Sequence, residues 1–218
     1  MSETAQLQRL LTFLSPAFPV GAFAWSAGLE TAIAEQTLTD STRLQNWLSG
    51  SLAHGSLRAD AILLSVAYRT SPDQLRPIAD LALALTPSAE RTQELLLTGD
   101  AFAKAAAAWP SAVYGKLPRQ CPYPIAVGAI AAAHGIGLEP TLIGFLTALV
   151  QSQVSVAVRL VPIGQTAGLA IMASLEPEVA RLAAAATMAT LDDLGGIAYA
   201  TDIAQMRHET LPTRIFRS

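Results

Sequence analysis

Residues 140–162 contain the stretch that decides the fold, PTLIGFLTALVQSQVSVAVRLVP. Its large side chains recur every three or four residues, which places them on one face of an α-helix. This stripe consists of Leu142, Phe145, Leu146, Leu149, Gln153, Val156 and Leu160. Pro140 precedes the stripe and Pro162 follows it, and proline is tolerated in the first turn of a helix but not in its interior. The stretch therefore predicts one long helix with a buried face.

Similar stripes occur along most of the chain. Leu7, Leu10, Leu11 and Leu14 form one, and Leu44, Trp47, Leu48 and Leu52 form another. Helix starts are expected at three further prolines, Pro72, Pro87 and Pro124. No run alternates with period two, and no Asn-Gly or Asp-Gly hairpin signal occurs. We therefore predict an all-α protein, a single-domain bundle of roughly nine to ten helices over residues 1–218.

Composition excludes several classes of protein. The chain has 218 residues, of which 51% are hydrophobic and only 14% charged, so it can bury enough apolar area to fold. The net charge of −3 argues against a nucleic-acid partner, which needs a basic surface. The single cysteine, Cys121, excludes a disulfide framework. We expect a cytoplasmic globular protein whose surplus apolar surface is covered by partner proteins.

Two uncharged stretches raise the alternative of a membrane protein. Residues 10–29 include Pro16 and Pro19, which would break the backbone hydrogen bonds of a spanning helix. Residues 140–158 include four polar side chains between positions 151 and 155. No signal peptide is visible at the N-terminus, because no basic region precedes an apolar core. We therefore expect no membrane partner.

The polar clusters do not assemble into a recognisable active site. His208-Glu209 lacks the second histidine of a zinc-binding HExxH motif, so a helix-end histidine facing solvent or a carbonyl is expected. The glycine-containing residues 164–168 lack the lysine of a phosphate-binding loop. A metal enzyme would require His54, His134 and His208 to converge. We expect a protein with no catalytic residue, no metal ligand and no cofactor.

Three segments contain features that folding alone does not require. The N-terminal segment, residues 15–30, is SPAFPVGAFAWSAGLE, a stiff apolar loop with three aromatic side chains. Residues 161–166 form a proline–glycine break between two helical patterns. The C-terminal segment, residues 206–218, is MRHETLPTRIFRS, in which arginines flank large apolar groups. Because chain ends are usually polar and frayed, this last segment is expected to be a partner-docking tail.

These three segments resemble the urease accessory protein F family (UreF). Residues 15–30 are similar to the family's SPALPVGAFAYSxGLE, residues 161–168 to its VPLGQTAG, and the C-terminal segment to its MRHETQYSRLFRS ending. The three motifs occur in register along the whole chain. The chain departs from the family pattern at Trp25, where a tyrosine is usual, at residues 211–213, and at Leu169, where a glutamine is common.

The resemblance implies an all-helical, non-enzymatic scaffold that takes part in nickel insertion. Members of the family bind the accessory protein UreD, also called UreH, and the GTPase UreG, and act on apo-urease subunits as homodimers. An alternative function is regulation of the UreG GTPase cycle, with Arg214 or Arg217 as an arginine finger. The residues expected to bind partners are Pro16, Phe18, Pro19, Trp25, Ser26, Glu30, Gln165, Arg207, His208, Glu209, Arg214, Phe216, Arg217 and Ser218.

Overall fold

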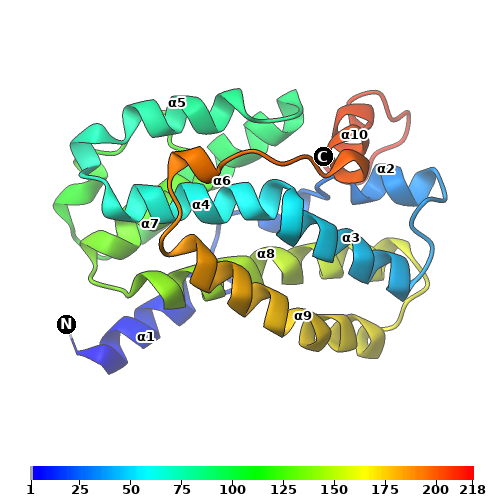
Figure 1. Ribbon diagram of the computed structural model, residues 1–218, viewed down its shortest axis with the longest axis horizontal. Helices are drawn as coiled ribbons and strands as arrows, with labels where there is room; N and C mark the ends of the chain where they lie inside the picture. Colours follow the sequence, from blue (N-terminus) through cyan, green and yellow to red (C-terminus); the bar gives the residue numbers. More distant parts are fainter. Residues whose placement is uncertain (1) are drawn as a thin grey trace.

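The computed structural model describes residues 2–218, and over that range its regular structure is entirely helical (Figure 1). This confirms the all-α prediction. The α-helices are α1 (Glu3–Phe13), α2 (Leu29–Ala34), α3 (Ser41–His54), α4 (Ser56–Arg69), α5 (Arg76–Ala84), α6 (Ala89–Ala106), α7 (Tyr123–Ala133), α8 (Leu138–Leu160), α9 (Gln165–Ala186) and α10 (Tyr199–His208). Short 3-10 turns lie at η1 (Ala22–Ala24), η2 (Pro72–Gln74), η3 (Ala112–Gly115) and η4 (Leu191–Asp193).

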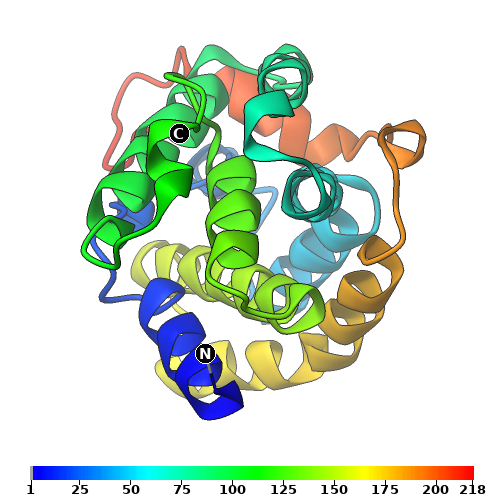
Figure 2. The ribbon, with the colours of Figure 1, turned by 90° about the vertical axis from the view of Figure 1, so that its left-hand side faces the viewer.

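Helices α4 and α7 form the centre of the bundle. Helix α4 packs against α3, α7, α8 and α9, and α7 also packs against α6 and α8. In the view of Figure 2, α7 runs down the middle of the molecule. Residues 123–131 of α7 are all buried, as expected of a helix that is apolar on every side. Helix α10 packs against α2, α3 and α6, so the last helix of the chain lies beside one of the first (Figure 1).

The stripe predicted in residues 140–162 faces the core. Leu142, Phe145 and Leu146 are fully buried in α8, and they belong to one apolar cluster that extends through the bundle. Helix α8 ends at Leu160, two residues before Pro162, as predicted. Within residues 2–218, α8 is the only helix long and apolar enough to cross a membrane by length and composition, but half of its most apolar window is buried inside the bundle. This burial is typical of a core helix.

Two of the predicted helix starts are displaced. Pro72 begins the short turn η2 rather than a long helix, and α5 begins at Arg76. Pro87 precedes the N-cap of α6, because the hydroxyl of Ser88 accepts a hydrogen bond from the backbone N–H of Arg91. Side-chain capping therefore determines the start of α6. Pro124 does lie in the first turn of α7, as predicted.

Close contact between α4 and α7 depends on Gly128. A Cβ atom at this position would lie 2.3 Å from the carbonyl oxygen of Leu64 and 3.1 Å from the backbone nitrogen of Tyr68. Both neighbours are backbone atoms of α4, so they can yield only if the whole helix moves. Gly50, in the middle of α3, has open space at the same point.

We expect Gly128→Ala to lower the free energy of unfolding by about 1–3 kcal/mol, because the added methyl group forces two central helices apart. Gly50→Ala is the matched control, and it should raise stability by about 0.5–1 kcal/mol through helix propensity alone. Urea unfolding of both variants measures the difference. Equal effects at the two positions would show that α4 and α7 are not held at this separation.

Candidate assembly surface

The N-terminal segment is shaped by backbone turns that bring it against α10. Gly28 has a φ of 81°, a left-handed conformation that glycine adopts without strain. A Cβ atom at this position would also lie 2.9 Å from the backbone nitrogen of Gln205. Glycine is therefore required here both by the turn and by the approach of α10. The turn aims the side chains of Ser26 and Glu30 into the protein, where both are buried.

Glu30 is the point at which the two ends of the chain meet. Its Oε1 accepts a hydrogen bond from the backbone N–H of Ile215 at 2.7 Å, and its Oε2 accepts one from Phe216 at 3.0 Å. The same Oε2 lies 3.0 Å from Nε2 of His208. Burial alone would raise the pKa of the Glu30 carboxyl, but the hydrogen bonds from His208 and from the two backbone groups lower that pKa below its ordinary value. Glu30 is thus held as a carboxylate.

His208 lies between two carboxylates. Its ring is fully buried, and Nδ1 lies 2.7 Å from Oε2 of Glu90, opposite the contact with Glu30. Oε1 of Glu90 accepts a hydrogen bond from Arg214 at 2.7 Å. The expectation that His208 faces solvent or a capping carbonyl is therefore wrong, because α10 packs its last turn between α2 and α6, which supply the two glutamates.

The end of the chain is fastened to the N-terminal segment mainly through the backbone. The N–H and the hydroxyl of Ser26 both donate hydrogen bonds to a backbone oxygen of Ser218, the last residue. The N–H of Arg217 donates to the carbonyl oxygen of Ala24 at 2.8 Å. The guanidinium of Arg217 also lies over the ring of Trp25, 5.8 Å from its centroid, in a cation–π contact. The C-terminal segment therefore docks against its own chain.

The predicted partner-binding residues divide into a buried set and an exposed set. The buried set consists of Phe18, Trp25, Ser26, Glu30, His208, Phe216 and Ser218. Phe18, for example, packs against Phe13 and Phe102 in the core, with ring centroids 5.6 and 5.5 Å apart. The exposed set consists of Pro16, Pro19, Gln165, Arg207, Glu209, Arg214 and Arg217. Direct contact with a partner in this conformation is open only to the exposed set.

Two exposed residues near the start of the C-terminal segment are held by contacts with other parts of the chain. Arg207 pairs with Glu35, the residue after the end of α2, at 3.1 Å. Glu209 accepts a hydrogen bond from the backbone N–H of Ala89 at 2.7 Å. Gln165 is different. It lies at the first position of α9, and within residues 2–218 no hydrogen bond or ion pair links it to the N-terminal or C-terminal segment. The structure thus joins the N-terminal and C-terminal segments by hydrogen bonds and leaves Gln165 outside that network.

Helix α10 presents an apolar stripe that sequence reasoning missed. Tyr199, Ile203 and Met206, spaced at i, i+4 and i+7, are 69%, 43% and 49% exposed. Ile215 in the C-terminal segment is also exposed. Apolar side chains spaced along one helix face usually mark a core contact, so the sequence alone did not distinguish this stripe from the buried ones. Exposed contiguous apolar surface of this kind is typical of a protein-binding site.

The three histidines lie in separate surroundings, so the convergence required of a metal enzyme does not occur. Nδ1 of His134 is 2.9 Å from the guanidinium of Arg9, and its Nε2 is 3.0 Å from the hydroxyl of Tyr114. Burial, with a smaller contribution from Arg9, lowers the pKa of His134. His54 is exposed at the end of α3. No group of three or more His, Cys, Asp or Glu side chains within residues 2–218 is placed to hold a metal ion.

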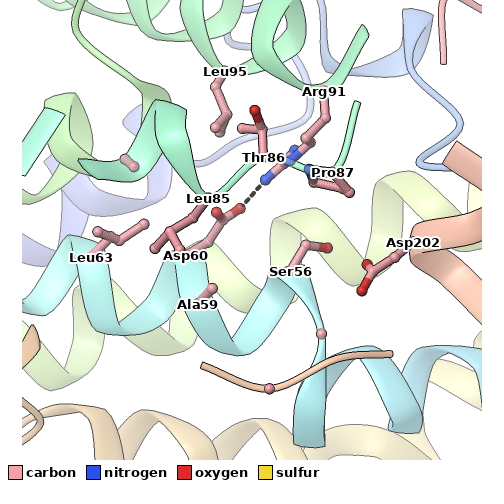
Figure 3. A pocket seen from close by; sticks show the side chains of 13 residues that line it. Ser56, Ala59, Asp60, Leu63, Leu85, Thr86, Pro87, Arg91, Leu95 and Asp202 are labelled. Atoms are coloured by element: carbon pink, nitrogen blue, oxygen red, sulfur yellow. Dashed lines mark hydrogen bonds and ion pairs between the residues drawn. The ribbon is translucent and has the colours of Figure 1, made fainter. Parts of the chain in front are cut away.

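A buried ion pair lines a hollow between α4, α5 and α6 (Figure 3). Asp60 of α4 bonds to Arg91 of α6, and Arg91 also bonds to Glu94 at 2.7 Å. Burial raises the pKa of Asp60 despite the opposing effect of Arg91. The hollow has a volume of about 90 Å³, and Asp202 of α10 also lines it. These charges join α4 and α6 on the side that supports α10.

Comparison with known proteins identifies the family. The UreF family model matches residues 38–176. The chain is 49% identical to the urease accessory protein UreF of Rhizobium etli over the full length of both proteins. The chain belongs to the UreF family. It is also 49% identical to the UreF of Agrobacterium fabrum and 44% identical to that of Rhodopseudomonas palustris, with the whole chain covered and 98% and 94% of those relatives.

The family-model match does not depend on two of the three segments that suggested the UreF resemblance. Residues 38–176 exclude both the N-terminal and the C-terminal segment, and among the predicted site residues they contain only Gln165. The full-length relatives extend the likeness to the two segments that meet at Glu30. The family assignment from the motifs is therefore confirmed by a match that lies mostly outside them.

We expect Glu30→Gln to loosen residues 214–218, because a carboxamide has one acceptor oxygen in place of two. The free energy of local opening of this segment should fall by about 1–3 kcal/mol, measured as faster hydrogen exchange at the amides of Ile215 and Phe216. Glu35→Gln, which alters an exposed ion pair just after the end of the same helix, is the control and should change exchange little.

The same carboxylate should make stability depend on acid pH. Because the folded-state pKa of Glu30 is lowered, its contribution is complete above its ordinary value of 4.5 and is lost as pH falls through the lowered value. Between pH 6 and pH 3 the wild-type chain should therefore lose more stability than Glu30→Gln does. Parallel losses in the two proteins would contradict this assignment.

Proposed function

We propose that this UreF-family protein is a non-enzymatic cytoplasmic scaffold in urease maturation, which binds UreD/UreH and recruits the GTPase UreG for nickel insertion into apo-urease subunits. One observation carries the proposal. The C-terminal segment is folded back over the N-terminal segment, and the exposed apolar stripe of α10 lies along the same part of the chain. Its full-length relatives are named urease accessory proteins, which supports the maturation role.

The exposed chemistry of this region suits a protein partner. Arg207, Arg214 and Arg217 are exposed beside the apolar side chains of Met206 and Ile215. Arginine and large apolar groups dominate the energetic centres of protein interfaces. The surplus apolar composition is thereby accounted for, because a UreD or UreG surface, or a second copy in a homodimer, would cover it.

The buried set of predicted residues acts in this proposal by shaping the surface. Glu30, Ser26 and His208 are too deeply buried to contact a partner, but they fix the path of the backbone from residue 214 to residue 218. A partner would therefore bind a preformed surface and lose less conformational entropy on association. Changes in either set should reduce assembly, for different physical reasons.

Regulation of the UreG GTPase cycle is the second candidate, and it is favoured by Arg217. Its guanidinium is exposed, and among the ion pairs of residues 2–218 it has no carboxylate partner. An arginine offered to the phosphates of a bound GTPase must be free in this sense. Arg214 suits this role less well, because Glu90 already holds it.

We expect Arg217→Ala to reduce capture of UreG, in the presence of UreD, by about 30-fold, the equivalent of about 2 kcal/mol. Arg217→Lys should restore little, since an ammonium group cannot reproduce the planar contact with Trp25. Co-expression, affinity capture and mass measurement of the complex test this expectation. Arg119→Ala, which removes an exposed arginine before α7, is the control. Undiminished UreG capture by Arg217→Ala would overturn the assignment.

The stripe of α10 makes a separate prediction. Met206→Glu should weaken capture of the UreD–UreG pair about tenfold or more, because a charge in an apolar contact must be desolvated. Leu97→Glu is the matched control, since Leu97 on α6 is equally exposed at 49%. Both variants should keep the helical circular dichroism of the wild type. If the two variants weakened capture to the same extent, the stripe would have no special role.

A further inference from the structure

Two hydrogen bonds link three ionisable groups around His208. Nδ1 lies 2.7 Å from Glu90, and Nε2 lies 3.0 Å from Glu30. A carboxylate can only accept a hydrogen bond, and a neutral imidazole has only one N–H to donate. With both glutamates ionised, the two bonds therefore require a proton on each ring nitrogen.

Both glutamates accept hydrogen bonds from donors other than His208. Glu30 accepts two backbone hydrogen bonds, from Ile215 and Phe216, besides the one from His208. Glu90 accepts a hydrogen bond from the guanidinium of Arg214. The second proton is thus placed on His208, as an imidazolium between two carboxylates.

We propose that Glu30, His208 and Glu90 form a proton-dependent latch that holds residues 211–218 against the body of the protein. Loss of one ring proton sets a nitrogen lone pair against a carboxylate oxygen, so one glutamate must move away. If Glu30 moves, the bonds to Ile215 and Phe216 are lost, and if Glu90 moves, the bond to Arg214 is lost. Either movement weakens the attachment of residues 211–218, whose end is also held by the hydrogen bonds between Ser26 and Ser218 and between Arg217 and Ala24.

Of the charged groups on the elements around His208, only Glu30 and Glu90 face its ring. The others named below have partners elsewhere or are exposed. Glu30 of α2 and Glu90 of α6 face the ring, while Glu35, just after the end of α2, is paired with Arg207. Glu209 bonds to the backbone of Ala89, and Arg214 bonds to Glu90. Helix α3, which also packs against α10, carries Arg43, paired with Asp40, and the exposed His54.

The linkage gives the latch a defined direction with pH. A histidine in water is neutral above about pH 6.5, so closing the latch above that pH takes up one proton. The closed state is therefore favoured at lower pH, and its equilibrium constant falls by up to about tenfold for each unit of rising pH.

Hydrogen exchange of the full-length chain tests the proposal without any partner protein. The protection factors of the Ile215 and Phe216 amides, corrected for intrinsic exchange, are measured from pH 6 to pH 8.5. We expect them to fall with rising pH in the wild type and in the control His54→Gln, which removes an exposed histidine. Side-chain nitrogen chemical shifts of His208 should show an imidazolium while the two amides remain protected.

The Glu90→Gln variant tests whether the contact between Glu90 and His208 makes amide protection depend on pH or only adds stability. Its carboxamide can donate to Nδ1, so a neutral ring then satisfies both neighbours. Protection should be lower overall, because Arg214 loses its ion pair, but it should no longer depend on pH. A wild-type slope in Glu90→Gln, flat protection in the wild type, or a neutral His208 ring with both amides protected would each overturn the proposal. None of these results depends on whether UreG is captured.

Discussion

The buried carboxylate of Glu30 is the constraint on which the arrangement of both chain ends depends. An ionised carboxylate away from water is strongly destabilising unless donors surround it. Its donors come from His208 and from the backbone of Ile215 and Phe216, all more than 170 residues later in the chain. Satisfying this one charge therefore requires α2, α10 and the end of the C-terminal segment to meet. The hydrogen bonds between Ser26 and Ser218 form where these elements meet.

The local features of the fold could be predicted from the sequence, whereas the long-range pairings could not. The stripe of α8 and its end before Pro162 depend on residues close in sequence, and both predictions are confirmed. Glu90 could not be found in this way, because a glutamate in the first turn of α6 is equally well explained by the helix dipole. For a similar reason the sequence favours solvent or a capping carbonyl as the surroundings of His208, since histidine is common at helix ends and nothing near it in sequence shows that two other helices enclose it.

The C-terminal segment shows why a motif can identify a family without showing how its residues act. Alternating arginine and apolar groups predict docking, but the pattern is the same whether the surface belongs to a partner or to the same chain. In the structure the backbone and Phe216 face inward, while Arg217 and Ile215 remain exposed. The same segment can therefore act on both sides. Its inner side attaches it to the rest of the chain, and its outer side is available for contact with a partner.

The departures from the family pattern are compatible with this arrangement. Residues 211–213 differ from the usual stretch. The hydrogen bonds that attach the end of the chain are made by backbone groups of residues 215–218, so they do not involve the side chains at positions 211–213. Trp25 lacks the hydroxyl of the usual tyrosine, yet its ring is buried beneath the guanidinium of Arg217. Indole offers the strongest cation–π surface among the aromatic side chains, so the substitution preserves the contact that needs a ring and gives up only a hydrogen-bonding group. In this chain, attachment of Arg217 to the N-terminal segment thus depends on a backbone hydrogen bond and a ring face.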